Sequence, residues 1–361
     1  MRRRLASVAG SVWYARSRER VARICDAQRD ALTLRLELLE EIRRAVGFDA
    51  HAWLLTDPET SVGSAPLADV PCLPELPGLI RLKYLTRVNR WTALSDPPVG
   101  RLHDATDGDL TRSPLWRELL SRYDVRDVAS SVFRDRFGCW GFLDLWRSGA
   151  LAPFSRDEAA FLVSIAKPLT EALRGCQAST FAVSPPHDPR RLGPVVLLLS
   201  PQLQVLGQTP ETEEYLRVLV PPTQGQAPIP ASAYNVAAQL LSVEADVDRN
   251  PPSARVHLSG GVWVTLRAAR IGDANGAADR DIAVTIEETS PSGRVALFSR
   301  AFAFSLRERE LLAHLVEGAD TREIAHRMFL SEHTVQDHLR SIFAKTSTRN
   351  RRTLLTRCLG T

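Results

Sequence analysis

The sequence predicts a multidomain chain in which two α+β domains precede an all-α domain of four helices. First, 361 residues exceed what one hydrophobic core ordinarily organises. Second, the proline-rich stretch at 184–189 can continue neither a helix nor a sheet. Third, mixed strand and helix patterns give way to purely helical spacing after about Arg300. We therefore expect domains at 20–178, 190–295 and 300–361.

The composition is that of an ordinary globular protein, with 44% hydrophobic and 24% charged residues. The longest strongly apolar run, 195–199, is far shorter than the roughly 20 residues of a membrane helix. The arginines near the start are not followed by the apolar core of a signal peptide. The five cysteines are scattered, which predicts free buried thiols rather than a metal site. We expect a cytoplasmic protein with no membrane partner.

In the first predicted domain, a helix ending at Gly47 opens an α+β pattern. Its buried face is predicted to consist of Leu32, Leu36, Leu39 and Val46. Strands are expected at 48–55, 129–133 and 140–146, with a long loop before the last two. Ser155 and Glu158 form a capping box that starts a long closing helix.

The second predicted domain contains short apolar runs separated by turn residues. Strands are expected at 195–199, 204–206, 255–258, 262–269 and 282–286. A helix is expected at 210–219, and loops at 221–230 and 248–252. The turn Ser259-Gly260-Gly261 indicates a hairpin.

Capping residues mark the helices of the third domain. Ser305 with Glu308, and Asp320 with Glu323, have the spacing at which side chains satisfy the free N–H groups of a first turn. Ser331 caps a third helix, and Gly318 is placed to end the first one. The apolar residues between these signals recur at helical spacing, and a short fourth helix follows around Leu354 and Leu355.

A short helix at 320–328, a tight turn and a longer helix at 331–346 form a helix-turn-helix pattern. The longer helix presents Gln336, Asp337 and Arg340 on the side opposite its apolar stripe. Residues 300–361 hold eleven Lys or Arg against seven Asp or Glu, which accounts for the whole net charge of +4. A basic cluster at one end is typical of nucleic-acid binding, although a solvated helix face gives the same pattern.

These residues resemble the LuxR-type helix-turn-helix family of bacterial regulators. The matching positions, in order and without gaps, are Arg307-Glu308, Gly318, Glu323-Ile324-Ala325, Leu330-Ser331, Thr334-Val335, His338, Ile342, Lys345 and Arg351. The resemblance implies a transcriptional regulator whose four-helix domain dimerises, commonly through its last helix, on a two-part site in double-stranded promoter DNA. It also makes RNA polymerase a candidate partner.

The resemblance also assigns roles to side chains. The positions that would read base edges are Gln336, Asp337 and Arg340. The positions that would support the helix or meet phosphates are Thr334, His338, Lys345 and Arg351. The resemblance implies structural roles for Glu308 and Glu323, as helix caps and as partners in internal ion pairs.

The chain departs from the family pattern at two places. Gln336 stands where the family usually has Lys, which suits a bidentate contact to adenine. Thr346-Ser347 replaces a usual Leu-Gly and is expected to loosen the end of the recognition helix.

The first two domains resemble GAF and PAS domains in their pattern of elements. That resemblance implies a small-molecule ligand of unknown identity, sensed as the signal. Six tryptophans could line its pocket, but core positions are the ordinary expectation; they are Trp53, Trp91, Trp116, Trp140, Trp146 and Trp263.

We expect neither an enzyme nor a cofactor. No phosphate-binding glycine loop, nucleophile elbow or paired-histidine metal motif is present, and His51, His103 and His257 lack metal-ligand spacing. The alternative to a ligand-responsive regulator is an interaction protein whose N-terminal domains bind another protein while the last domain tethers it to DNA.

Overall fold

The computed structural model describes residues 2–27, 29–182, 195–212, 230–258, 261–272 and 280–360. Contacts divide the chain into two compact units. Within the described residues, the first unit comprises 2–27, 29–173, 195–212, 230–256, 265–272 and 280–287. The second comprises 174–182, 257–258, 261–264 and 288–360.

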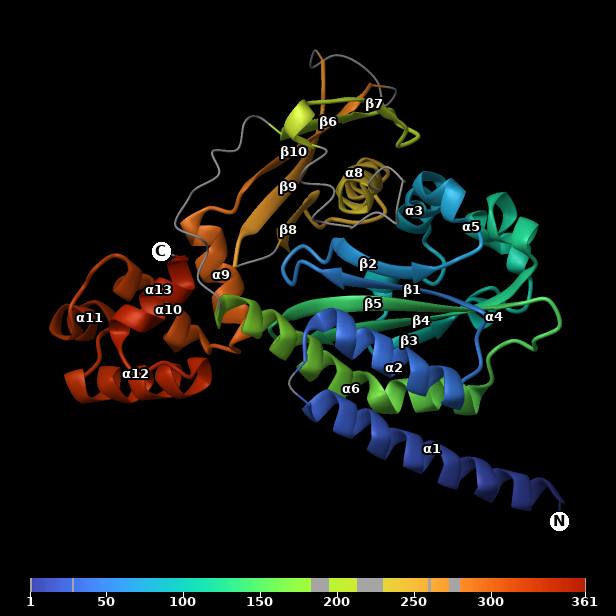
Figure 1. Ribbon diagram of the computed structural model, residues 1–361, viewed down its shortest axis with the longest axis horizontal. Helices are drawn as coiled ribbons and strands as arrows, with labels where there is room; N and C mark the ends of the chain where they lie inside the picture. The colour runs from blue at the N-terminus through green and yellow to red at the C-terminus, as the bar shows by residue number, and fades with distance from the viewer. Residues whose placement is uncertain are drawn as a thin grey trace. The chain divides into compact units, whose positions relative to one another are not determined.

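The first unit contains two five-stranded sheets (Figure 1). The strands of the first sheet run in the order β2-β1-β5-β4-β3, and all neighbours are antiparallel. Their bounds are β1 (Ala50–Thr56), β2 (Gly63–Asp69), β3 (Val99–Arg101), β4 (Val125–Asp135) and β5 (Gly138–Ser148). The three predicted strands correspond to β1, β4 and β5, while β2 and β3 fall in what we expected to be a long loop.

Helices cover both faces of this sheet. In Figure 1, α2 (Ala31–Ala45) and α6 (Arg156–Ser179) lie below it, and α3 (Leu76–Leu85) lies above it. The long helix α1 (Arg2–Asp26) packs on α2, where Ser17 and Arg20 both contact Glu41. The remaining short helices are α4 (Leu102–Ala105), α5 (Pro114–Glu118), η1 (Leu73–Glu75), η2 (Trp91–Ala93), η3 (Leu110–Arg112) and η4 (Leu120–Tyr123).

The predicted buried face of α2 was partly wrong. Leu39 and Val46 are buried, but Leu32 and Leu36 are 51% and 47% exposed. The buried stripe is instead Leu34, Leu38 and Ile42, which recur at the four-residue spacing of one helix face. Leucines occupy both faces of this helix, so hydrophobicity alone did not identify the packed side.

The second sheet has the order β7-β6-β10-β9-β8, the same as the first sheet when its strands are counted from its own start. Its bounds are β6 (Val195–Leu199), β7 (Val205–Gln208), β8 (Ser253–His257), β9 (Trp263–Arg270) and β10 (Ile282–Glu288). All five correspond to predicted strands. Most of the predicted helix at 210–219, and the turn residues Ser259 and Gly260, lie outside the described residues.

Helix α8 (Ala231–Glu244) was not predicted. It is buried on almost every side, and it packs on α3 and on β2 of the first sheet. A helix buried all round shows no contrast between an apolar and a polar face, so its sequence lacks the period that reveals an amphipathic helix.

Buried ion pairs join the two sheets into one unit. Arg255 Nε donates to Asp57 Oδ2 at 2.7 Å, and Arg90 Nη2 donates to Asp248 Oδ2 at 2.5 Å. These side chains are at most one-tenth exposed, so each charge is compensated where water is largely excluded. Within the described part of the chain, no helix is both long and apolar enough to cross a membrane.

Candidate nucleic-acid interface

Four helices form most of the second unit: α10 (Leu306–Val316), α11 (Thr321–Met328), α12 (Glu332–Thr346) and α13 (Arg351–Leu359). The helix α9 (Pro291–Ala301) precedes them (Figure 1). Ser305 and Glu308 form the predicted capping box, with Ser305 N donating to Glu308 Oε2 at 2.6 Å. Asp320 and Ser331 accept N–H groups of α11 and α12 at 2.8 and 3.1 Å. The three predicted helix starts are confirmed.

The connections between these helices use left-handed backbone. Gly318 after α10 has φ +93°, which glycine adopts at little cost. Phe329 ends α11 at φ +55° with its ring 94% exposed, and Ser347 ends α12 at φ +50°. A residue with a Cβ is strained in this region, so the departure of Ser347 from the family's glycine has a local energetic cost.

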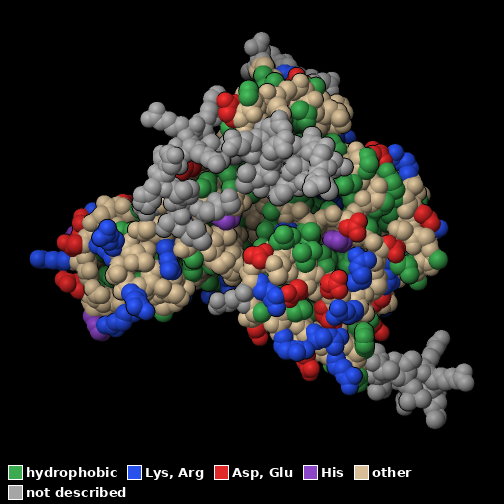
Figure 2. All heavy atoms as spheres, in the orientation of Figure 1, with side chains coloured by type: hydrophobic (Ala, Val, Ile, Leu, Met, Phe, Trp, Pro, Cys, Tyr) green, Lys and Arg blue, Asp and Glu red, His purple; other side chains and the backbone are tan. Residues whose placement is uncertain are grey.

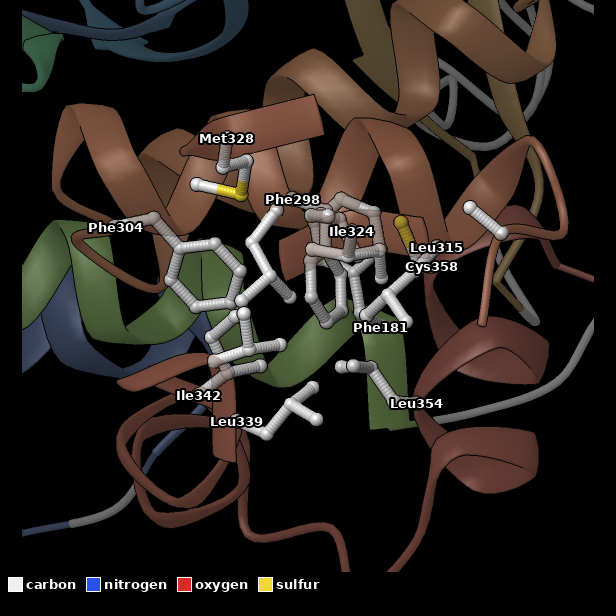
Figure 3. Packing of buried hydrophobic residues seen from close by; sticks show 14 of the residues in the cluster. Phe181, Phe298, Phe304, Leu315, Ile324, Met328, Leu339, Ile342, Leu354 and Cys358 are labelled. Carbon is white, nitrogen blue, oxygen red and sulfur yellow. The ribbon is translucent and has the colours of Figure 1, made fainter. Parts of the chain in front are cut away.

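The apolar stripes of the four helices meet in one core (Figure 3). Leu315, Ile324, Val335, Ile342 and Leu354 are each at most 1% exposed. This packing holds α11 and α12 together across the short turn, and it leaves the opposite side of α12 exposed.

The three predicted base-reading residues lie on that exposed side. Arg340 Nη1 donates to Asp337 Oδ1 at 2.5 Å, and His333 Nε2 lies 3.7 Å from Asp337 Oδ2. Gln336 Nε2 makes a long contact of 3.4 Å with Thr321 Oγ1. In Figure 2, Lys and Arg side chains (blue) are visible over the part of the molecule that α10–α13 form in Figure 1. Polar groups able to donate and accept therefore share one face of α12.

The other predicted contacts are less exposed. Thr334 and His338 are half-buried along the same helix. Lys345 Nζ donates to Glu308 Oε2 at 2.6 Å and to the Ala303 carbonyl at 3.2 Å. Arg351 Nη2 donates to the Leu315 carbonyl at 3.3 Å. In this arrangement Lys345 and Arg351 support the helices, which is one of the two roles expected for them.

Glu308 is a buried carboxylate that joins α10 to α12. Burial raises its pKa, but hydrogen bonds from Lys345, Ser341 and Ser305 outweigh burial and lower the pKa to about 2. Ser341 Oγ donates to Glu308 Oε1 at 2.7 Å. Ser341 was missed from the sequence, because a serine on the polar side of a helix carries no signal of an inward hydrogen bond. The ion pair with Lys345 fixes the last turn of α12 against α10.

An aromatic cluster completes this core from outside the four helices. Phe181, in the short helix η5 (Thr180–Ala182), stacks on Trp263 with ring centroids 5.4 Å apart. Phe181 also meets Phe298 of α9 edge to face at 5.3 Å, and Phe298 lies against Phe302 and Phe304 (Figure 3 shows Phe181, Phe298 and Phe304). Three separate chain segments thus contribute rings to one core.

Arg294 of α9 lies beside this cluster. Its guanidinium donates to the carbonyls of Gly261 and Arg357 at 2.7 and 3.4 Å and lies 5.0 Å from the Phe181 ring. Burial lowers the pKa of Arg294. His257 is close to Trp263, and burial together with the Arg294 charge lowers the pKa of His257 to about 4.

A capped short helix, a tight turn and a second capped helix with an exposed polar face define a helix-turn-helix domain. The family model described as "Bacterial regulatory proteins, luxR family" (GerE) matches residues 303–357. The C-terminal domain is therefore a LuxR-type helix-turn-helix domain, as its sequence predicted.

A curated relative, "Probable HTH-type transcriptional regulator GfsR" from Streptomyces halstedii, is 40% identical over 87 residues. The match covers 24% of this chain and 36% of that protein, so the chain matches only about a third of the relative's length.

Two solved structures are loosely similar. "SdiA in complex with octanoyl-rac-glycerol" aligns with 96% of this chain and 95% of its own at 14% identity and a TM-score of 0.33. "Crystal structure of the phage VqmA-DPO complex" aligns with 46% of this chain and 81% of its own, at 14% identity and a TM-score of 0.22. At TM-scores this low, no property of these two proteins can be assigned to this chain. The assignment of the C-terminal domain rests on the family match over residues 303–357.

Proposed function

We propose that this protein is a sequence-specific DNA-binding transcriptional regulator whose N-terminal sheets respond to a ligand or partner and control dimeric binding to promoter DNA. One observation carries the proposal. Gln336, Asp337 and Arg340 form an exposed polar face on the second helix of a LuxR-type domain, where such a helix enters the major groove.

Each of these side chains suits a base edge. Arg340 would donate to guanine O6 and N7, and Gln336 would bind adenine N6 and N7. Asp337 would accept from cytosine N4, or it would hold the Arg340 guanidinium in position through their 2.5 Å contact. Thr334, His338, Lys345 and Arg351 would orient the helix or contact phosphates.

We further propose that the sheets are sensor domains of the GAF and PAS kinds, at 20–178 and 190–295, ahead of the DNA-binding domain at 300–361. The first sheet is antiparallel, with a helix before it and the long helix α6 after it. The second has two strands, then α8, then three strands, an order that supports the PAS-like proposal although α8 is not the helix expected at 210–219. A cytoplasmic homodimer that contacts RNA polymerase is the assembly expected of such a regulator.

A second candidate function is supported by the packing over the first sheet. Lys83 and Asp144 form a buried ion pair at 2.9 Å, and Trp91 stacks on Phe142 at 4.8 Å. Trp91 Nε1 also donates to Asp144 Oδ1 at 2.8 Å. The protein's own side chains fill this part of the sheet's face, which favours a domain that binds another protein over one that encloses a ligand there.

The full-length protein tests the DNA-binding proposal. Sites enriched by chromatin pull-down and sequencing supply an operator, and gel shifts at fixed salt then compare single-base variants of it. Arg340→Ala should cost about 1–3 kcal/mol at one base pair if Arg340 reads guanine. The control Arg352→Ala removes an exposed cation of α13 and should weaken all sequences equally.

Two results would contradict the proposal. Uniform weakening by Arg340→Ala on every operator variant would reject its base-reading role. Binding without sequence preference or salt dependence would reject a regulator that contacts phosphates and reads bases.

A further inference from the structure

An open groove of about 600 Å³ lies on the first unit at the edge of the first sheet. Its walls come from the segment around η2, from the edge strand β3, and from the first turns of α6. On α6 the lining residues are Arg156, Ala159, Ala160 and Val163, which lie on one helix face.

The groove is lined by four arginines and a single carboxylate, Asp104. Arg90 is paired with Asp248, and Arg101 is paired with Asp104. Arg87 Nη2 donates only to the Asp246 carbonyl, at 2.7 Å, and Arg156 is exposed. Within the described part of the chain neither Arg87 nor Arg156 has a carboxylate partner, so both retain an uncompensated positive charge.

The start of α6 adds to this positive potential. Arg156 is the first residue of the helix, where the helix dipole favours an acid and disfavours a cation. The acids of the same turn do not line the groove: Asp157 and Glu158 lie off its face, and Glu158 is paired with Arg147. Arg156 therefore lines the groove from a helix position at which the dipole of α6 disfavours a positive charge.

A buried polar atom is unsatisfied in the wall of the groove. Asn89 is 9% exposed, and its Nδ2 donates to the Val128 carbonyl at 3.3 Å and to Ser130 Oγ at 3.0 Å. Its Oδ1 is buried and has no hydrogen-bond partner. A Cβ on the neighbouring Gly100 would lie 2.4 Å from that Oδ1, so only glycine leaves room for it. An unfilled acceptor in the wall of a groove is a place for a donor group of a ligand.

We propose that this groove binds a small organic anion. Its carboxylate or phosphate group would pair with Arg156 and Arg87, since guanidinium groups match both oxyanions bidentately. A hydroxyl or N–H group of the same molecule would donate to Asn89 Oδ1. The inference rests on the proposed function, because it names the ligand class for the sensing half of that regulator.

Calorimetric titration of the full-length protein at constant ionic strength tests this. Citrate supplies carboxylates and a hydroxyl, tricarballylate supplies the carboxylates alone, and inorganic phosphate represents the phosphate class. One citrate should bind per chain, and tricarballylate should bind more weakly. Binding of phosphate in place of citrate would assign the anion to the phosphate class.

Variants locate the site. Arg156→Gln and Arg87→Gln should each weaken binding about tenfold, the effect of losing one charge-assisted hydrogen bond. The matched control Lys167→Gln removes an exposed cation from the same helix, about three turns further on. Equal weakening by Lys167→Gln and Arg156→Gln would overturn the assignment. Failure of the unmodified protein to bind any of the three anions, or binding of an acidic peptide alone, would overturn it as well.

Gel shifts on the same variants separate this inference from the proposed function. Selective DNA binding without anion binding would reject the proposed anion site and leave the proposed regulatory function unaffected. Anion binding at the groove without selective DNA binding would reject the regulatory function and leave the anion site unaffected.

Discussion

The substitution Trp263→Ala tests whether the core of the helix-turn-helix domain depends on residues outside its four helices. The side chain is 4% exposed and stacks on Phe181, with ring planes 17° apart. Replacing a buried Trp by Ala costs about 3–5 kcal/mol, of which the ring pair accounts for roughly 0.5–1.5 kcal/mol. Because Phe181 also supports Phe298, we expect Trp263→Ala to destabilise α10–α13, although Trp263 lies in β9.

Hydrogen exchange of the full chain, followed by mass spectrometry, measures this effect. A loss of 3 kcal/mol should accelerate exchange of the most protected α10–α13 amides about a hundredfold or more. Trp263→Phe retains a ring and should have a smaller effect. The control Trp116→Ala removes a half-buried indole of the first unit and should leave these amides unchanged. The reasoning fails if Trp263→Ala accelerates exchange in β9 while α10–α13 stay as protected as before.

Three further predictions concern the same unit. The pKa of His257 is lowered to about 4 from 6.5, so the unfolded chain takes up the proton first, and stability should fall as pH drops from 6.5 towards 4. His257→Phe should remove that part of the pH dependence of the melting temperature; an unchanged profile would refute it. The pKa of Glu308 is lowered to about 2 from 4.5, so its stabilisation is present above 4.5 and is lost as pH falls towards 2. Glu308→Gln should cost about 1–3 kcal/mol at pH 7 in denaturant titrations and flatten that acid limb, and an unaltered midpoint would count against the ion pair with Lys345. Ser347→Gly should stabilise the unit by about 0.5–1 kcal/mol, because glycine relieves the left-handed strain at φ +50°; a lower melting temperature would contradict this.

The sequence predicted the C-terminal domain well, because its signals are local. Caps such as Ser305 with Glu308 act within one turn, and the apolar stripes repeat with the helical period. All five strands of the second sheet and three of the first were also found, since short β-rich runs stand between turn residues, whereas β2 and β3 fell in the expected loop. The exposed face of α12 followed from the same period.

What the sequence could not predict depends on contacts between distant segments. Helix α8 was missed because burial on all sides erases its amphipathic period, and the buried face of α2 was misassigned because leucines lie on both sides. The groove that Asn89 and Arg156 line could not be predicted, because these residues lie about 70 positions apart in the sequence. The same holds for the unsatisfied oxygen of Asn89. The ring of Phe181 lies in a stretch whose partners follow more than 80 residues later.

The aromatic cluster also bears on how this DNA-binding module could be exchanged between proteins. The family match begins at residue 303. The rings of Phe181 and Trp263 nevertheless belong to the core that α10–α13 form, and the Gly261 carbonyl accepts a hydrogen bond from Arg294 beside it. A chimera joined at residue 303 would lack these two rings and this carbonyl, and the sequence before the junction would have to replace their contacts. Grafts that carry the 180–182 and 261–264 segments along with α9 should keep the helices in their present packing.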